Sequence, residues 1–284
     1  MPPILLHGAA SALYAGLALY FWNIRWRPGP TAIRASGPLE RIAILLPAVL
    51  HGWLLYSDLF LAAEPRLGFA HALSAMLWLG VVLFWVESHF LDLRGVEPFP
   101  LAGAALAAPL PALFPGRLTF AYGGSSEFIA HVTLGLLAYG VIGVAVLHLA
   151  LMVAVERRLH GPASGALGLD AASSLGGPLS NLPPLLTLER LLFRLIGTAF
   201  ALLTLTVGLG IAFSEAIYGK PFRFDHKTLF SLLAWATLLM LLAGRHFYGW
   251  RGQTAMRWTM ASFVFLMLAY VGRSFVLEVV LGRV

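Results

Sequence analysis

The sequence predicts an all-α integral membrane protein, a bundle of about eight transmembrane helices with both termini outside the cytoplasm. Hydrophobic residues make up 59% of the 284 residues and charged residues only 11%, whereas a soluble domain carries roughly 25% charged residues. Apolar runs recur along the whole chain, and several approach the ~20 helical residues that a bilayer crossing requires. These runs predict spans near residues 4–22, 42–61, 69–86, 101–114, 128–155, 190–214, 228–244 and 257–280.

The spans form a single transmembrane domain over residues 1–284, in two parts. Residues 1–156 hold a five-span front half, and residues 190–284 hold a three-span back half. Residues 157–189 between them are rich in Gly, Pro, Ser and Ala, which predicts a flexible cytoplasmic linker. The fourth span is the shortest and contains Pro109 and Pro111.

The distribution of basic residues predicts the orientation. The first apolar block has no basic residue before it, so its N-terminus is expected outside the cytoplasm. Lys220, Arg223 and Lys227 share one outer loop, so they are exceptions to the rule that basic residues lie mainly in cytoplasmic loops. With eight spans, the cytoplasmic loops hold most basic residues, namely Arg25, Arg27, Arg34, Arg41, Arg94, Arg157, Arg158, Arg190, Arg194, Arg245, Arg251 and Arg257.

The composition and the known short motifs exclude several kinds of chemistry. The chain has no cysteine, which excludes disulfides, thiolate metal sites and covalent heme attachment through its own thiols. No phosphate-binding loop, H-E-x-x-H or G-x-S-x-G motif is present. A net charge of +6 is explained by orientation in the membrane rather than by nucleic-acid binding. No classical catalytic activity is expected.

Histidines are the ionisable residues whose predicted positions, within or beside the membrane spans, are the least usual. His51 lies near mid-membrane, where we expect a ligand or a buried hydrogen-bond network, because ionisable groups are costly there. His131 lies at the outer mouth of the fifth span, His226 just before the seventh, and His246 near a cytoplasmic end. Imidazole commonly binds heme iron, but these histidines could also bind Cu or Zn, or relay protons.

The other histidines fit simpler interpretations. Histidines at helix ends are usually interfacial, and His148 could hydrogen-bond across helices. The interfacial interpretation applies to His7, His71, His89 and His160.

The outer loop at residues 215–228 carries a motif of a known family. The run from Tyr218 to Asp225, Y-G-K-P-F-R-F-D, resembles a softened form of W-G-x-x-W-x-W-D, the tryptophan-rich loop of the CcsA and CcmC cytochrome c assembly family. Beyond it, Lys227 and Trp235 occupy the positions of a lysine and a tryptophan in that family.

Further pieces over residues 128–280 follow the family's order. His131-Val132 followed by Tyr139 resembles the start of a membrane span in that family. Leu203-Thr204-Leu205 resembles a motif within a later span. Among similar proteins, the eight-span HemX and YpjD branch looks closest. Two other matching motifs are Leu182-Pro183-Pro184 with Leu188-Glu189-Arg190, and the turn Gly249-Trp250-Arg251-Gly252.

The resemblance implies heme b as a cofactor and names candidate ligands. His131 would be an outer heme-iron ligand and His246 a transmembrane one, with His51 as its candidate counterpart. His131 and His246 lie at opposite membrane faces, so they cannot share one heme. Trp235 and the aromatic outer loop would contact heme. The loop residues that would do so are Tyr218, Phe222, Phe224 and Asp225.

The chain also departs from the family pattern. Its three motif tryptophans are replaced by Tyr218, Phe222 and Phe224, and residues 277–284 carry no histidine. His226, next to Asp225, is a candidate substitute for the absent outer ligand. These departures favour an accessory or regulatory role over a complete heme-presenting synthase.

Two functions follow as hypotheses. The first is a heme-binding or heme-handling protein of the bacterial inner membrane, whose partners are heme, the lipid bilayer and another membrane protein of cytochrome assembly or heme synthesis. The alternative is a non-heme accessory factor that stabilises a partner membrane protein or modulates heme synthesis or ion transport. A transporter or channel is disfavoured because Asp and Glu are nearly absent from the spans, apart from boundary residues such as Asp58, Glu87 and Glu215.

Overall fold

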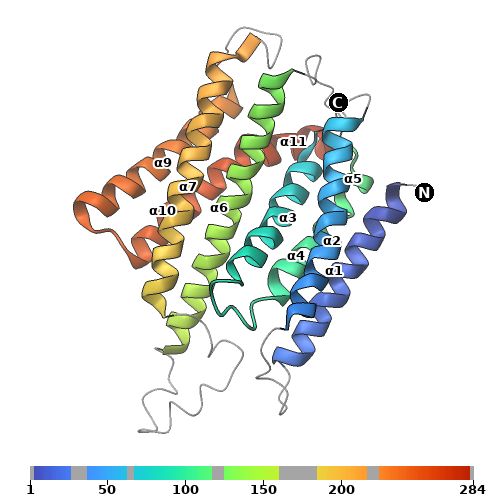
Figure 1. The fold of residues 1–284 in the computed structure, drawn as a ribbon. Helices are drawn as coiled ribbons and strands as arrows, with labels where there is room; N and C mark the ends of the chain where they lie inside the picture. The colour runs from blue at the N-terminus through green and yellow to red at the C-terminus, as the bar shows by residue number, and fades with distance from the viewer. Residues whose placement is uncertain are drawn as a thin grey trace.

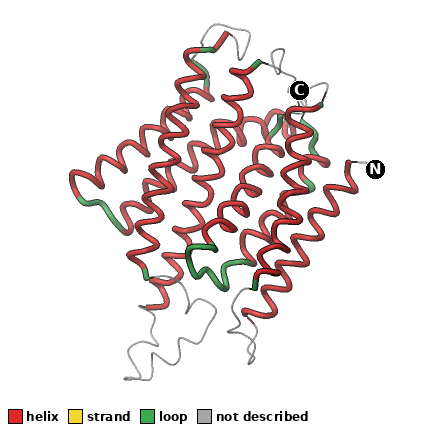
Figure 2. Tube along the Cα trace, in the orientation of Figure 1, coloured by secondary structure: helices red, strands yellow, loops and turns green. Residues whose placement is uncertain are grey.

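The computed structural model describes residues 3–26, 37–62, 67–116, 125–159, 184–215 and 224–281. Within these ranges all regular structure is helical, and short loops connect the helices (Figure 2). The helices are α1 (Pro3–Trp26), α2 (Pro38–Tyr56) with the π-helical turn η1 (Ser57–Leu61), α3 (Phe69–Glu87), α4 (Pro98–Ala107), α5 (Leu110–Leu113), α6 (Ser126–Leu159), α7 (Leu185–Ala212), α9 (His226–Tyr248), α10 (Gly252–Met267), η4 (Leu268–Gly272), α11 (Arg273–Phe275) and η5 (Val276–Val280).

Among the described residues, seven helical runs are long and apolar enough to cross a membrane. They coincide with seven of the eight predicted spans, which confirms the fold class. The runs are Ile4–Trp26, Pro38–Leu61, Phe69–Glu87, Ser126–Ala154, Leu185–Ala212, His226–Tyr248 and Gly252–Val280.

The fourth predicted span is a shorter apolar element made of α4 and α5. Pro109 has no N–H to donate to the Ala105 carbonyl, which interrupts the helix. Ser11 Oγ of α1 donates to that carbonyl instead, at 2.7 Å, and His7 Nδ1 donates to Ala108 O at 2.7 Å. The break is therefore stabilised by α1, because freed carbonyls in an apolar bundle need new donors.

Both chain ends lie toward the same end of the bundle (Figure 1). We call this end, where α3, α6 and α9 begin, the predicted outer end, and the opposite end the predicted inner end. The side of the membrane on which each end lies stays a prediction.

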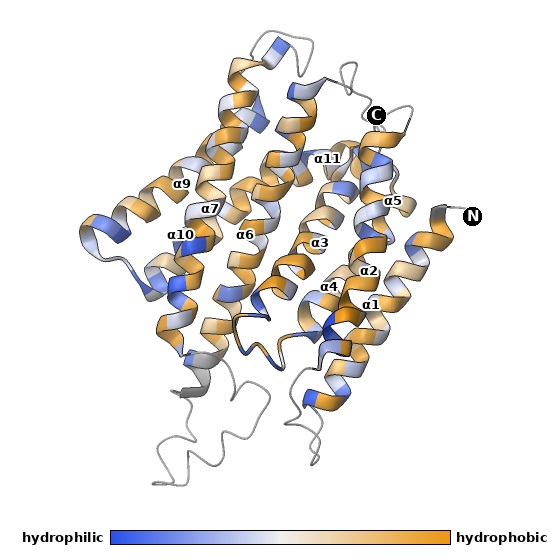
Figure 3. Cartoon of the chain, in the orientation of Figure 1, coloured by the Kyte–Doolittle hydropathy of each residue, from blue (hydrophilic) through white to orange (hydrophobic). Residues whose placement is uncertain are grey.

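The described helices enclose two large hydrophobic clusters and a third, small one around Leu59 and Phe128. The first lies among α1–α4 and includes Tyr14, Phe21 and Leu101. The second lies among α6, α7, α9 and α10 and includes Ile142 and Leu238. Helix α6, which the sequence assigned to the front half, thus contributes mainly to the core shared with the back half. Hydrophobic residues also cover much of the helices' length (Figure 3), as expected where helices face lipid.

Two helix ends differ from the predicted boundaries of the linker. Helix α6 continues to Leu159, and α7 begins at Leu185, so both helices extend into residues 157–189. Residues 160–183 of the predicted linker lie outside the described residues.

Candidate functional site

His131 lies in the second turn of α6, at the predicted outer end, against α7. Its Nδ1 is 3.1 Å from the carbonyl oxygen of Thr206. A carbonyl can only accept, so Nδ1 carries the proton and the ring's lone pair is on Nε2. Histidines that bind metals commonly hold their other ring nitrogen in this way. His131 therefore has the tautomer that an iron ligand needs.

The side chain of His131 is also confined by Gly210 of α7. A Cβ atom built on Gly210 would lie 3.0 Å from the His131 Cε1. The ring thus occupies space that the missing side chain leaves, and a larger residue there would displace it.

Asp225 directly precedes α9, at the same end of the bundle as His131. Its Oδ1 accepts hydrogen bonds from the Thr228 backbone N–H at 3.0 Å and the Thr228 hydroxyl at 3.1 Å, which is a helix N-cap. Partial burial alone would raise the pKa of Asp225, but these hydrogen bonds and the nearby Lys227 and Arg273 bring it below its usual value. The family aspartate thus has a structural role.

The other loop candidates are only partly described. The side chains of Phe224 and His226 are both exposed, and no contact between His226 and His131 is found among the described residues. Tyr218 and Phe222 lie outside the described residues.

Lys227 connects α9 to the C-terminal helical segment. Its Nζ lies 5.6 Å from the centre of the Tyr270 ring, a cation–π arrangement. The Tyr270 hydroxyl donates to Leu67 O at 2.8 Å, just before α3 begins. The family lysine therefore helps hold the predicted outer end together.

Trp235 is fixed between α9 and α7. Its Nε1 donates to the Thr204 hydroxyl at 2.9 Å, and its ring stacks on Phe200 with centroids 5.6 Å apart. The motif residue Thr204 and the motif tryptophan, 31 positions apart, thus meet directly.

His246 and His51 lie apart from His131. His246 is exposed in the last turn of α9, about 30 Å along that helix from its start at a rise of about 1.5 Å per residue. His51 is fully buried in α2, where its Nε2 lies 2.8 Å from Ser74 Oγ. The sequence predicts that His131 and His246 lie at opposite membrane faces, and their positions at the start of α6 and the end of α9 agree with this. His51 belongs to a buried network.

A buried group of polar side chains in the front half was not predicted. His7 and His71 are each 1% exposed, so the interfacial interpretation is wrong for both. The Nε2 atoms of His7 and His71 lie 3.5 and 3.8 Å from the same oxygen, Asp58 Oδ2. The sequence feature that indicates such a group is the spacing of His51 and Asp58, which lie seven residues apart and so share one helix face.

His148 links α6 to α3. Its Nδ1 donates to Val144 O at 3.0 Å, and its Nε2 lies 3.2 Å from Glu87 Oε2. His148 thus lies against the end of α3 through Glu87, and a hydrogen bond across the two helices stays a prediction.

At the predicted inner end, two family motifs form one unit. Glu189 of the L-E-R motif accepts from Arg245 Nη1 at 2.6 Å and lies 3.1 Å from Arg251 Nε. Gly249 and Gly252 both have positive φ, 66° and 50°, conformations that favour glycine. The G-W-R-G turn is therefore shaped by its glycines and tied to α7 by Glu189.

Heme iron requires fewer protein ligands than a bare metal ion does. Within the described ranges, no three His, Asp or Glu side chains are arranged to hold a metal ion. Heme iron needs only one or two axial protein ligands, and His131 presents the required nitrogen. The described residues do not place a second ligand beside it.

The fold and these contacts define a polytopic α-helical membrane protein whose sequence motifs meet in space. The chain belongs to the cytochrome c assembly protein family, whose model matches residues 40–281. It is a multi-pass protein of the bacterial inner membrane.

Three relatives illustrate the family. The inner membrane protein YpjD of Escherichia coli K12 is 26% identical over 185 residues, covering 65% of this chain and 64% of that protein. The cytochrome c biogenesis protein CcsA of Guillardia theta is 24% identical over 226 residues, covering 78% and 68%. The protein HemX of Brevibacillus brevis is 26% identical over 148 residues, covering 52% and 50%. No solved structure matches the chain.

Proposed function

We propose that this chain binds or handles heme at its predicted outer end, with His131 as an iron ligand. The supporting observation is the His131 Nδ1 hydrogen bond to Thr206 O, which leaves Nε2 as the coordinating atom. Heme-related chemistry also agrees with family membership and with the similarity to a cytochrome c biogenesis protein.

The cofactor is proposed to be heme b, held without a covalent bond. The chain has no cysteine for a thioether linkage. When bound, heme would supply an iron centre for ligand binding or electron transfer. His131 would bind and orient it, Thr206 would fix the imidazole tautomer, and the aromatic residues Tyr218, Phe222 and Phe224 would cover it.

His226 is the proposed second outer ligand. It is exposed at the start of α9, one residue after Asp225. His246 and His51 are kept as candidates for a separate inner position, because neither lies near His131.

The proposed role is accessory or regulatory rather than that of a complete heme-presenting synthase. Tyrosine and phenylalanine stand at the three tryptophan positions of the family's outer loop. A loop altered in this way favours heme storage, transfer or sensing with another membrane protein of cytochrome assembly or heme synthesis.

An optical spectrum of the full-length protein, purified from heme-replete cells, tests the proposal. We expect a Soret band that shifts on reduction, and a loss of about tenfold in hemin affinity, ~1.4 kcal/mol, for His131→Ala. His89→Ala is the matched control, because His89 is exposed at the predicted inner end. A protein without a Soret band that does not respond to hemin would refute the proposal.

A second candidate function is a non-heme accessory factor that stabilises a partner membrane protein or modulates heme synthesis or ion transport. The observation that favours it is the intact unit of Glu189, Arg245 and Arg251, which needs no cofactor. Under this alternative, Arg251→Gln would impair function in cells while His131→Ala and His246→Ala would not.

A further inference from the structure

A pocket of about 340 Å³ opens at the predicted inner end of the front half. Its walls come from the end of α1, the start of α2, the end of α3 and the loop at residues 88–97. This volume lies within the range of small-molecule sites in proteins. None of the family motifs contributes a residue to this pocket.

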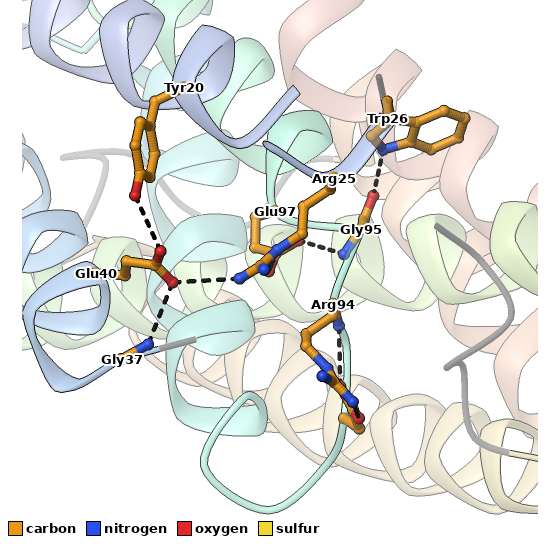
Figure 4. Close-up of polar contacts among 9 residues, drawn as sticks. Tyr20, Arg25, Trp26, Gly37, Glu40, Arg94, Gly95 and Glu97 are labelled. Atoms are coloured by element: carbon orange, nitrogen blue, oxygen red, sulfur yellow. Dashed lines mark hydrogen bonds and ion pairs between the residues drawn. The ribbon is translucent and has the colours of Figure 1, made fainter. Parts of the chain in front are cut away.

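Two of the arginines around the pocket are paired with carboxylates (Figure 4). Arg25, only 3% exposed, lies 3.2 Å from Glu40 Oε2 through Nη2 and 3.5 Å from Glu97 Oε1 through Nε. Arg94 Nε donates to Asp92 Oδ1 at 2.7 Å. Three carboxylates are thus opposed by two guanidinium groups.

Among the described residues around the pocket, Arg41 is a third arginine. Its side chain lines the pocket, and its guanidinium makes no hydrogen bond or ion pair among the described residues. Its Nε is shielded from solvent without a partner. An enclosed N–H group without a partner is costly, so the site is suited to an anionic group.

The pocket also offers a partner for a positive charge. Asp92 is 43% exposed, and an ionised carboxylate has about four acceptor positions, more than its contacts with Arg94 use. Within the part of the chain that the structure describes, three arginines, Arg41 included, balance three carboxylates around the pocket. A ligand that carries both charges therefore fits better than a simple anion.

The depth of the pocket corresponds to the edge of a bilayer. Helix α1 ends at Trp26, α2 begins at Pro38 and the third span ends at Glu87, all at the level of the pocket. Trp22 and Trp26 stack there with centroids 5.0 Å apart, and aromatic residues are typical of membrane interfaces. Phe90, on the pocket wall, is 81% exposed.

We propose that this pocket binds the zwitterionic phosphoethanolamine headgroup of a membrane phospholipid, with the phosphate on Arg41 and the ammonium on Asp92. The acyl chains would lie along exposed apolar side chains such as Phe90. Arginine suits this role because its planar guanidinium group can donate two parallel hydrogen bonds to two phosphate oxygens. The proposal is independent of heme binding.

Native mass spectrometry of the full-length protein in detergent tests this site. Phosphatidylethanolamine, phosphatidylglycerol and phosphatidylcholine with matched acyl chains are added at equal concentrations. We expect phosphatidylethanolamine to be retained most strongly, because phosphatidylglycerol lacks an ammonium group and phosphatidylcholine has no ammonium N–H. Arg41→Gln should weaken phosphatidylethanolamine binding about tenfold, and Arg41→Lys should lose less.

Asp92→Asn should reduce the preference for phosphatidylethanolamine over phosphatidylglycerol. Arg190→Gln is the matched control, since Arg190 is exposed at the predicted inner end of α7, and it should bind lipid as the wild type does. Equal binding by Arg41→Gln and wild type, or no lipid preference in the wild type, would overturn the proposal. If free phosphoethanolamine displaces the lipid at an equal concentration, the pocket recognises the headgroup alone. That result would overturn the proposal that the bound group belongs to a membrane phospholipid.

Discussion

Glu189 accepts a 2.6 Å hydrogen bond from Arg245, although 56 residues separate the two along the chain. Glu189 is 9% exposed and also lies 3.1 Å from Arg251 Nε. Arg245 further donates to Trp250 O at 3.3 Å. One carboxylate thus joins the start of α7, the end of α9 and the turn into α10.

Replacing Glu189 should destabilise this junction. Glu189→Gln leaves Arg245 without its charged partner, and we expect a loss of about 1–3 kcal/mol in the free energy of unfolding. Thermal unfolding of the protein in detergent measures it. Arg190→Gln, at the neighbouring exposed position, should change stability little. Equal stability of Glu189→Gln and wild type would contradict the structural role.

This junction illustrates what could be predicted from the sequence. The long apolar runs predict the spans, since backbone groups in lipid must be bonded within helices. The motifs at Glu189 and Gly249–Gly252 were identified from their order alone. Their contact could not be predicted, because it depends on how α7 and α9 pack.

The group around Asp58 shows where sequence reasoning failed. A depth derived from each histidine's own helix predicts that His7 and His71 are interfacial. Burial depends instead on neighbouring helices, and the Pro109 break draws the His7 ring toward Ala108 O. The pairing of His131 with a second candidate ligand stays a prediction, because loop geometry decides whether His226 approaches His131.

Arg25 should be among the least replaceable residues. It pairs with Glu40 and Glu97 while 3% exposed, and removing one partner of a buried ion pair costs about 3–5 kcal/mol. Arg25→Gln should therefore lower the unfolding free energy by an amount of this order. Tyr20→Phe removes a hydroxyl donor to Glu40, so it should cost about 0.5–1.5 kcal/mol. Similar losses in the two variants would argue against the buried pair.

Glu97 should give stability a specific pH dependence. Burial raises the pKa of Glu97 above its usual 4.5, despite opposing hydrogen bonds and the nearby Arg25. Between 4.5 and the raised pKa, the folded state holds more protons than the unfolded state, so this residue's contribution to stability falls as pH rises. Unfolding temperatures across this window should therefore decline less steeply for Glu97→Gln. An unchanged slope would contradict the assignment.

Asp58 and His7 should be energetically coupled. Each of Asp58→Asn and His7→Gln leaves a polar partner behind, so the double variant should lose less stability than the sum. We expect a coupling energy of about 0.5–3 kcal/mol from a double-mutant cycle of unfolding. A cycle between Asp58 and the distant His89 should give a value near zero. Equal coupling in the two cycles would show that the 3.5 Å contact contributes nothing specific.

Two glycines on α7 provide a matched test of His131 as a heme ligand. A Cβ on Gly210 would lie 3.0 Å from His131 Cε1, whereas a Cβ on Gly208 would meet no atom within 4 Å. Alanine is the better helix former by about 1 kcal/mol, so neither substitution should weaken the helix itself. Gly210→Ala should displace the imidazole from Thr206 O and lower hemin affinity about tenfold, the scale of effect seen when a metal ligand loses its supporting hydrogen bond.

Hemin titration followed at the Soret band compares the two variants. Gly208→Ala should bind hemin as the wild type does, while Gly210→Ala binds more weakly, although both retain His131. If Gly210→Ala also matches the wild type while His131→Ala has lost binding, the orientation of the ring by α7 is unimportant. If all three variants bind as the wild type does, the iron is held elsewhere, and His51 and His246 become the residues to replace.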